Sequence, residues 1–378
     1  MFRHDSSHTG YSTSPAPVTN STLWSYTTEL WGGSSPAVVN GRLYVCASDN
    51  NMYCLSAGTG AKIWNCTIGY PTDSSPAVAD GRVYIGSGVY VYCLDAGTGA
   101  KIWNYTLGQA VTYSSPAVVN GRVYIGSGDF KVHCLNASTG SLIWNYTTGN
   151  GIWSSPAVVG GRVYIGSLDK NVYCLDAVNG TKIWNYSTGM PVLSSPAVVG
   201  GKVYVGSHDK NIYCLNASIG SKIWNYTTER EIFSSPAVAD EKVYIKSGQD
   251  GKIYCLAGDT GSKIWSNTIG STTGASNTPS PAVADGKVYI GSLDKNVYCL
   301  DASTGVEIWK YATGEAIYSS PAVSGEVVYV CARDGKVYAF GTMYVPEFPT
   351  GTSAILPLIM LTGTLLLTKR MRYNKRGL

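Results

Sequence analysis

The chain has 378 residues, of which only 14% are charged, whereas glycine and tyrosine are abundant with 44 and 28 copies. This composition suits an all-β surface or secreted protein better than a cytosolic enzyme rich in Lys-Glu helices. Five basic residues among the last ten carry more than the formal net charge of +4, which leaves about −1 for the rest, so we expect no nucleic-acid-binding face.

The first 20 residues are predicted to form an entry segment ahead of the repeats. Met1 to Asp5 is polar and is not followed by the apolar core of a signal peptide, so we interpret the recorded N-terminus as truncated. His4 and His8 are four residues apart, but the sequence indicates neither a helix nor a third ligand beside them. We therefore predict no metal site here.

Residues 21–342 are built on one repeated unit. Its Pro-Ala-Val proline lies at 36, 76, 116, 156, 196, 236, 281 and 321, and its tryptophan at 24, 64, 103, 144, 184, 224, 265 and 309. Short β-branched runs joined by Asn-Gly, Asp-Gly or Gly-Gly turns divide each unit into four strands. In one unit these are predicted at 155–159, 162–166, 172–175 and 182–186. A period near 40 with four strands predicts a β-propeller.

The two ends of the repeat region complement each other. The unit that begins at Pro321 stops after three strands, at Phe340, and lacks the tryptophan strand. The strand from Leu23 to Thr27 carries Trp24 but has no Pro-Ala-Val before it. We therefore predict an all-β, eight-bladed propeller of four-stranded blades, closed by this N-terminal strand so that no sheet edge stays open.

The stretch from Leu94 to Trp103, LDAGTGAKIW, resembles the tryptophan-docking motif of pyrroloquinoline-quinone-like (PQQ-like) repeat propellers. The resemblance covers roughly residues 1–342 and departs where cysteine replaces the leading alanine of the motif. It implies that each tryptophan docks against the neighbouring blade, where burial of a ring contributes a few kcal/mol. The docking residues would be Trp24, Trp64, Trp103, Trp144, Trp184, Trp224, Trp265 and Trp309.

Three further side chains recur with the repeat. Seven cysteines share one position in the third strand, and we interpret them as small buried apolar residues, with a Cys46–Cys54 bridge as an alternative. We interpret the aspartates of the second turn, such as Asp169, as turn residues rather than calcium ligands. Sequons that follow a tryptophan are glycosylation candidates, or simply repeated strand sequence, at Asn65, Asn104, Asn145, Asn185 and Asn225.

The residue before each Ser-Ser-Pro varies although the scaffold does not require it to vary. This position faces the central funnel of a propeller, where an aromatic collar would stack on a sugar, a flat ring or a peptide; the alternative is loop packing. Together with charged departures from the repeat, the candidate ligand-binding residues are Trp31, Asp73, Tyr113, Trp153, Phe233, Tyr318, Arg230 and Arg333. We predict no catalytic residue and no metal ligand.

The C-terminal sequence has the features of a membrane anchor. Residues 343–349 form a linker that contains Pro346-Glu347-Phe348, and residues 350–378 are predicted to be a transmembrane segment with a basic tail. The uncharged run from Phe348 to Thr368 would span about 30 Å as a helix, and the basic residues after it follow the positive-inside rule. The order of these parts resembles the sorting signal that archaeosortases read on archaeal surface proteins; a plain membrane anchor is the alternative. Both place the propeller outside the cell membrane.

Three functions are compatible with the sequence. We favour a non-catalytic cell-surface propeller that binds an unknown protein, peptide or carbohydrate and needs no cofactor. The resemblance implies an alternative, a dehydrogenase of alcohols or sugars that uses pyrroloquinoline quinone with calcium. Those enzymes have blade insertions and a vicinal disulfide, and this chain has no Cys-Cys pair. A second alternative is a scaffold resembling the outer-membrane assembly lipoprotein.

Overall fold

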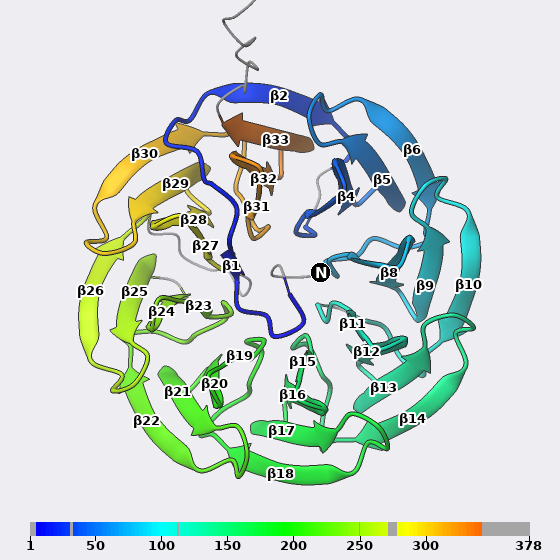
Figure 1. Ribbon diagram of the computed structural model, residues 1–378, viewed down its shortest axis with the longest axis vertical. Helices are drawn as coiled ribbons and strands as arrows, with labels where there is room; N and C mark the ends of the chain where they lie inside the picture. Colours follow the sequence, from blue (N-terminus) through cyan, green and yellow to red (C-terminus); the bar gives the residue numbers. More distant parts are fainter. Residues whose placement is uncertain (1–4, 31–32, 112, 249, 271–277, 342–378) are drawn as a thin grey trace, which may run out of the picture. The chain divides into compact units, whose positions relative to one another are not determined.

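A computed structural model describes residues 5–30, 33–111, 113–248, 250–270 and 278–341. The regular elements in these ranges are all β-strands, and the strands form eight blades around a central axis (Figure 1). Within the same ranges there is no helix able to cross a bilayer. The predicted all-β, eight-bladed architecture is confirmed, while the predicted transmembrane segment at 350–378 and the linker at 343–349 lie outside the described residues.

One repeat makes one blade. In blade 4, β15 (Ala157–Val159) lies nearest the axis and is followed outward by β16 (Arg162–Gly166), β17 (Asn171–Asp176) and β18 (Lys182–Ser187) (Figure 1). These strands match the predicted ones to within two residues at each end. The tight turn between β15 and β16 needs two left-handed residues, with φ of 58° and 73°, and glycine at 160 and 161 adopts them without strain.

The other blades repeat this order of strands. Blade 1 contains β3 (Ala37–Val39), β4 (Arg42–Cys46), β5 (Asn51–Ser56) and β6 (Lys62–Thr67). Blade 2 contains β7 (Ala77–Ala79), β8 (Arg82–Ser87), β9 (Tyr90–Asp95) and β10 (Lys101–Thr106). Blade 3 contains β11 (Ala117–Val119), β12 (Arg122–Gly126), β13 (Lys131–Asn136) and β14 (Leu142–Thr147). Blade 5 contains β19 (Ala197–Val199), β20 (Lys202–Gly206), β21 (Asn211–Asn216) and β22 (Lys222–Thr227).

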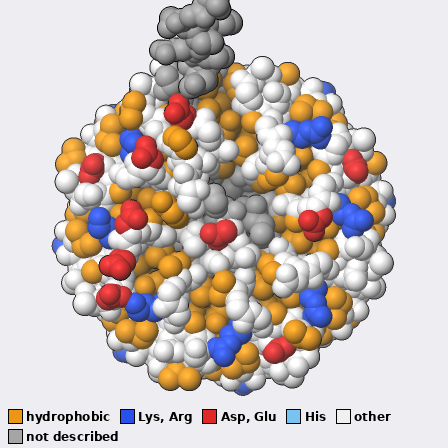
Figure 2. Space-filling model, in the orientation of Figure 1, with side chains coloured by type: hydrophobic (Ala, Val, Ile, Leu, Met, Phe, Trp, Pro, Cys, Tyr) orange, Lys and Arg blue, Asp and Glu red, His pale blue; other side chains and the backbone are white. Residues whose placement is uncertain are grey.

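The last three blades differ more from the repeat. Blade 6 contains β23 (Ala237–Ala239), β24 (Lys242–Lys246), β25 (Lys252–Ala257) and β26 (Lys263–Thr268). Blade 7 contains β27 (Ala282–Ala284), β28 (Lys287–Gly291), β29 (Asn296–Asp301) and β30 (Glu307–Ala312). Blade 8 contains β31 (Ala322–Ser324), β32 (Val327–Cys331), β33 (Lys336–Gly341) and, as its outermost strand, β2 (Thr22–Thr27). Figure 2 shows basic and acidic side chains interspersed around one face of the ring.

The pairing of β2 with β33 closes the ring. The two strands are antiparallel, with Trp24 opposite Ala339 and Thr27 opposite Lys336. Strands from both ends of the repeat region therefore share the sheet of blade 8. β33 is paired on its outer side with β2, so its outer edge is not exposed. The predicted closure by the N-terminal strand is confirmed, and it removes the exposed edge that would otherwise invite aggregation.

Tryptophan docking joins each blade to the next. In blade 4 the Trp184 Nε1 donates a 3.0 Å hydrogen bond to the Ala217 carbonyl of blade 5, and the Tyr164 hydroxyl donates to the same oxygen at 3.1 Å. The indole covers Gly220, where an added Cβ would lie 2.6 Å from the ring. Glycine is therefore required under the ring by contact as well as by its φ of 74°. The docking interaction implied by the family resemblance is present.

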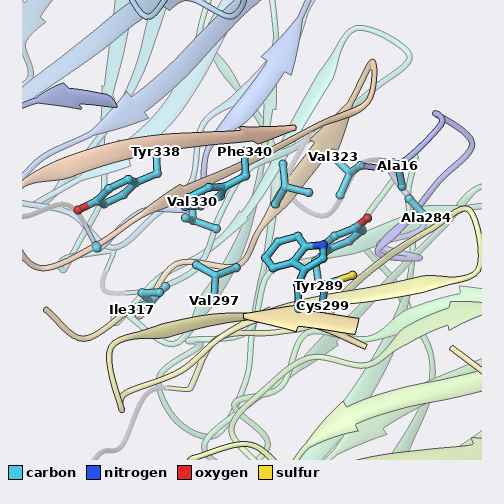
Figure 3. Close-up of a cluster of buried hydrophobic side chains, with 13 residues drawn as sticks. Ala16, Ala284, Tyr289, Val297, Cys299, Ile317, Val323, Val330, Tyr338 and Phe340 are labelled. Atoms are coloured by element: carbon cyan, nitrogen blue, oxygen red, sulfur yellow. The ribbon is translucent and has the colours of Figure 1, made fainter. Parts of the chain in front are cut away.

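The seam between blades 7 and 8 departs from this pattern, because blade 8 has no turn between its third and fourth strands in sequence. The entry segment fills that place: Ala16 is buried in the local core, and the Tyr289 hydroxyl donates to the Pro17 carbonyl at 2.7 Å (Figure 3). Trp309 remains 92% buried against Phe340, yet its Nε1 has no acceptor among the described residues.

The entry segment also crosses the central channel. β1 (Tyr11–Ser12) pairs in parallel with β27 at Val283 and Ala284, so blade 7 becomes a five-stranded sheet (Figure 1). Upstream of β1 the segment passes over the innermost strands of blades 4, 5 and 6. No sequence pattern predicts this path, because the segment is not part of the repeat.

All ten cysteines are free thiols, nine of them buried. The proposed Cys46–Cys54 bridge was wrong. The register of β4 and β5 places Cys46 opposite Met52 and Cys54 opposite Tyr44, so the two thiols are two residues apart along the hairpin rather than facing each other. The interpretation of the repeated cysteines as small buried residues is confirmed.

Candidate functional site

A closed ring of serines lines the central channel. The second serine of each Ser-Ser-Pro uses its backbone N–H to donate to the Oγ of the equivalent serine in the next blade, and the eight hydrogen bonds measure 2.8–3.0 Å. The members are Ser35, Ser75, Ser115, Ser155, Ser195, Ser235, Ser280 and Ser320, and the last donates to the first. Every blade is thereby fixed to both neighbours at the same height.

Sequence reasoning missed this ring, although a signal was present. In blade 7 the first serine of the pair becomes Pro279, whereas the second is retained as Ser280. The retained serine is the one that bonds between blades, and the first serine bonds within its own blade, as when the Gly166 N–H donates to Ser154 Oγ at 3.1 Å.

Breaking one link of the ring should have a measurable cost. We expect Ser195→Ala to lower the free energy of unfolding by about 1–3 kcal/mol, because the buried Ser155 N–H loses its acceptor. Urea unfolding followed by tryptophan fluorescence measures the change, with the exposed Ser218→Ala as the matched control. Equal stability of the two variants would show that the ring is not a stabilising element.

The variable positions before the serines converge on one cavity. A space of about 70 Å³ at the funnel is lined by the serine ring and by Gly33, Asp73, Tyr113, Trp153, Leu193, Phe233, Thr278 and Tyr318. Five predicted ligand-binding residues are therefore brought together: Asp73, Tyr113, Trp153, Phe233 and Tyr318. Of the remaining three, Arg230 is exposed and does not line the cavity, Arg333 reaches it through Tyr318, and Trp31 lies outside the described residues.

The collar, meaning these eight cavity-lining residues, has a polar arc over blades 8, 1 and 2. The Arg333 guanidinium lies 4.1 Å from the centre of the Tyr318 ring, a cation–π geometry. Burial raises the pKa of the Asp73 carboxyl, and the charge of Arg333 opposes this rise. Gly33 of blade 1 stands between the two blades that carry these charges, and it has no side chain to separate them.

An aromatic arc follows over blades 3 to 6. The Tyr113 and Trp153 rings meet edge to face with centroids 5.2 Å apart. Burial raises the pKa of the Tyr113 hydroxyl, and the negative charge of Asp73 adds to this effect. In blade 6 the Phe233 ring packs edge to face against His208, at 4.3 Å. Burial lowers the pKa of His208, which favours its neutral form beside the phenyl ring.

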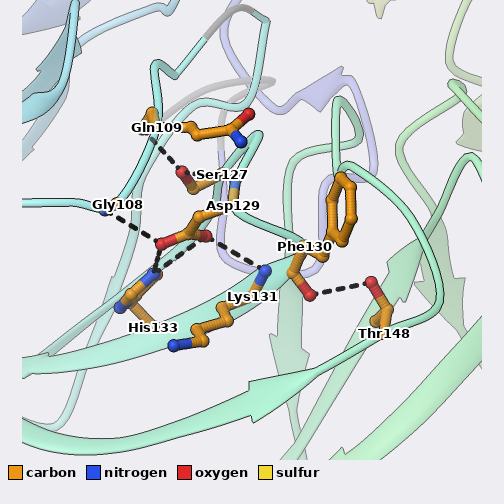
Figure 4. A network of polar contacts seen from close by, with 8 residues as sticks. All are labelled: Gly108, Gln109, Ser127, Asp129, Phe130, Lys131, His133 and Thr148. Carbon is orange, nitrogen blue, oxygen red and sulfur yellow. Dashed lines mark hydrogen bonds and ion pairs between the residues drawn. The ribbon is translucent and has the colours of Figure 1, made fainter.

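The repeated aspartates of the second turn form hydrogen bonds within the scaffold. The Asp129 carboxylate accepts hydrogen bonds from His133 Nε2 at 2.9 Å and from the backbone N–H groups of Gly108 and Lys131 at 3.1 Å (Figure 4). Burial raises the pKa of Asp129, but the hydrogen bond and charge of His133 outweigh it and hold the pKa below its usual value. The equivalent Asp169 accepts from the Tyr173 hydroxyl instead, at 2.7 Å. Sequence reasoning gave His133 no role, although the repeat shows that it replaces the tyrosine of the third strand. The hydrogen bond from that position to the turn aspartate is visible only in the structure.

Neither a metal cluster nor a calcium-like ligand set emerges from the described ranges. Within them, no three His, Cys, Asp or Glu side chains are placed to share an ion. His4, one of the two histidines considered above, lies outside the described residues, and His8 is buried on the entry segment. The five predicted glycosylation sites after the docking tryptophans are exposed on the outermost strands, and their modification stays a prediction.

Comparison with known proteins identifies related propellers. The family model of the beta-propeller of beta-alanine-activating enzyme matches residues 35–285, and that of the outer membrane protein assembly factor BamB matches residues 249–342. The first match covers about two thirds of the chain. No curated protein sequence matches the chain at a significant level.

Solved structures share the fold at low sequence identity. BamB from Moraxella catarrhalis is 19% identical with a TM-score of 0.74, over 86% of this chain and 98% of its own. The computationally designed Ika8 protein is 17% identical with a TM-score of 0.74, over 85% and 99%. A europium-containing methanol dehydrogenase is 14% identical with a TM-score of 0.75, over 90% and 97%. At these identities the likeness concerns the fold. With the blades, docking tryptophans and family match together, the chain is a PQQ-like repeat β-propeller that belongs to the beta-propeller family of beta-alanine-activating enzyme.

Proposed function

We propose that this propeller is a non-catalytic binding protein and that the collar is its ligand site. One observation carries the proposal. The tryptophans, turn aspartates and channel serines do the same structural work in nearly every blade, whereas the collar positions differ between blades and still converge on one cavity. A scaffold that needs only closure would not require a charged arc on one side and an aromatic arc on the other.

The collar chemistry favours a saccharide. Tyr113 and Trp153 offer ring faces and edges that pack against the C–H groups of a sugar. The Asp73 carboxylate and the Arg333 guanidinium are an acceptor and a donor for hydroxyl groups on the same side of the funnel. A cavity of about 70 Å³ is smaller than the roughly 300–1,000 Å³ of pockets that enclose a whole ligand, so one sugar residue at a chain end would rest in the mouth.

The described collar does not fit a quinone with calcium. Ca²⁺ takes six to eight oxygen ligands, usually with several carboxylates, and among the described lining residues Asp73 is the one carboxylate. The cavity is also several times smaller than a pocket that encloses a drug-sized ring system. The residues therefore support binding more than they support the alternative of a quinone-dependent dehydrogenase.

We propose that the C-terminal segment displays the propeller outside the cell membrane. The support is in the sequence: an uncharged run from Phe348 to Thr368, preceded by Pro346-Glu347-Phe348 and followed by basic residues. The mass of the mature protein tests whether this segment is removed by a sorting enzyme. A mass that ends near Glu347 supports sorting, and an intact basic tail supports a plain anchor.

The binding proposal predicts a specific pattern of mutational effects. On an array of immobilised oligosaccharides, the full chain should retain a subset of glycans, and Trp153→Ala should weaken that binding by about 10-fold or more because the stacking surface is lost. Asp73→Asn should weaken it as well. Leu193→Ala, at the one aliphatic position among the described collar residues, is the matched control and should change affinity by less than threefold.

Three other outcomes would contradict the proposal, and each would favour a different site or function. Retention that is equal for the wild type and Trp153→Ala would place the binding outside the collar. Stoichiometric uptake of pyrroloquinoline quinone with calcium, followed by dye-linked oxidation of an alcohol or sugar, would establish the dehydrogenase. Binding to an outer-membrane assembly partner and to no glycan would favour the scaffold alternative.

A further inference from the structure

The innermost strand of each blade presents one backbone amide to the central channel. In blade 4, Val158 and Val163 form a non-hydrogen-bonded pair between β15 and β16. The N–H and C=O groups of a residue in such a pair point away from the partner strand. On an innermost strand they therefore point into the channel, and the pattern is the same in every blade because the register is the same.

The entry segment shows how a peptide uses these amides. Its carbonyls accept from the equivalent valine of four successive blades: Ser6 from Val158 at 2.7 Å, Ser7 from Val198 at 2.9 Å, Thr9 from Val238 at 2.7 Å and Gly10 from Val283 at 2.8 Å. The four carbonyls thus supply the acceptors that the channel-facing amides of blades 4 to 7 need. They do so from an irregular segment, in which Ser6 and Ser7 lie in a turn and only Tyr11–Ser12 is β-strand.

Blades 1 and 2 present the same amides without such a cover in the described structure. Val38 pairs with Leu43 and Val78 with Val83, again in the non-hydrogen-bonded register. Among the described residues neither N–H has an acceptor. Their side chains are half-buried, whereas Val158 is 3% exposed. Both valines line a cavity of about 280 Å³ that is bounded on its other side by Gly10, Ser12 and Ser14 of the entry segment.

The lining of this cavity defines what fits. Its described residues carry no charge and are small, being serine, glycine, alanine, proline and valine. It meets the funnel cavity at Ser35 and Ser320 of the serine ring and otherwise involves none of the collar residues. The uncharged lining and the backbone donors suit a peptide main chain with uncharged side chains rather than a charged ligand.

We propose that this cavity is a peptide site: an uncharged segment of a partner protein crosses the innermost strands of blades 1 and 2. Its carbonyls accept hydrogen bonds from the N–H groups of Val38 and Val78, as Ser6 and Ser7 accept from Val158 and Val198 in blades 4 and 5. The site is separate from the collar, so the propeller holds two ligands, a saccharide at the mouth and a peptide in the channel.

The experiment uses a fluorescein-labelled heptapeptide with the sequence of residues 6–12, Ser-Ser-His-Thr-Gly-Tyr-Ser, and the full chain. Fluorescence anisotropy measures binding, and hydrogen–deuterium exchange with mass spectrometry locates it. We expect at least threefold slower exchange in segments 36–40 and 76–80 when the peptide is present, with no change around Tyr113 and Trp153. A version with lysine at each serine should bind at least 10-fold more weakly, because the lining offers no carboxylate.

Two variants distinguish the contribution of the Val78 backbone N–H to peptide binding from that of the Val78 side chain. Val78→Pro removes the N–H and should weaken peptide binding by about fivefold, the effect of one lost hydrogen bond. Val78→Ala retains the N–H and should weaken it less than twofold. Thermal unfolding of both variants checks that the blade is intact, and the exchange measurement on the wild type does not depend on either. Absence of binding, or protection confined to the funnel mouth, would overturn the proposal and leave the saccharide site unaffected.

Discussion

Trp184→Ala is expected to lower the free energy of unfolding by about 3–5 kcal/mol, as for other large-to-small changes in a well-packed core. The indole is 8% exposed and packs between the Tyr164 ring and Gly220 of the next blade. The Ala217 carbonyl keeps its hydrogen bonds from Tyr164 and Arg162, so the loss comes mainly from the cavity rather than from an unsatisfied acceptor. Urea denaturation measures the change.

Trp309, at the seam between blades 7 and 8, provides a control for the contribution of the Nε1 hydrogen bond to the stability lost in Trp184→Ala. Trp309 occupies the equivalent position in blade 7 with the same 8% exposure, but its Nε1 lacks an acceptor among the described residues. Trp184→Phe should therefore destabilise the protein by about 1 kcal/mol more than Trp309→Phe. If both substitutions cost the same, the Nε1 hydrogen bond contributes nothing and docking is packing alone.

Lys246→Met is expected to stabilise the protein at pH 7 by about 3 kcal/mol. In five blades glycine stands at this position, and the loop of the next blade packs a valine or isoleucine on it, as Ile232 packs on Gly206. The Lys246 side chain is 98% buried, and burial lowers its pKa to about 8, against opposing effects of Asp294 and Asp250. One pKa unit corresponds to about 1.4 kcal/mol, so the lowering from 10.5 gives the expected magnitude.

The stability advantage of Lys246→Met should fall as the pH rises, whereas an advantage from packing alone would not depend on pH. Below about pH 8 the lysine is protonated in both the folded and the unfolded state, and the full penalty is present. Between about pH 8 and 10.5 the folded protein releases this proton while the unfolded chain holds it, so this group makes the wild type more stable as pH rises. The advantage of Lys246→Met should therefore shrink over that interval.

Chemical denaturation at pH 7, 8.5 and 10 measures the advantage. Lys182→Met, which removes an exposed positive charge, is the matched control and should change the stability by less than 0.5 kcal/mol at each pH. A Lys246→Met variant that is less stable than the wild type at pH 7 would show that the ammonium group is well paired, and the interpretation of its burial as costly would then be wrong.

Most of the fold is predictable from the sequence repeat. Strand order, blade number and closure follow from the spacing of Pro-Ala-Val and tryptophan, because each blade is a local meander whose turns are specified by glycine and asparagine. The collar was predictable for a related reason: Asp73, Tyr113 and Trp153 are departures from a pattern, and a pattern makes departures visible.

Two features were not predictable from the sequence, for physical reasons. The retention of Ser280 marks the position of the serine ring, but the contact between blades depends on how far each blade stands from its neighbour, a distance that no single repeat encodes. The path of residues 5–17 across the channel depends on backbone amides that every blade presents alike, so its contacts are made by main chain and leave no side-chain pattern.

The seam between blades 7 and 8 has a consequence for the kinetic stability of the protein. It is the one junction at which Pro17 of the entry segment stands in place of the turn between a third and a fourth strand. Its tryptophan, Trp309, lacks among the described residues the Nε1 hydrogen bond that the other seven docking tryptophans form. Unfolding should therefore start there, and the half-life in a protease-rich setting would be set by this junction. Strengthening any other blade would raise the equilibrium stability and leave that half-life nearly unchanged.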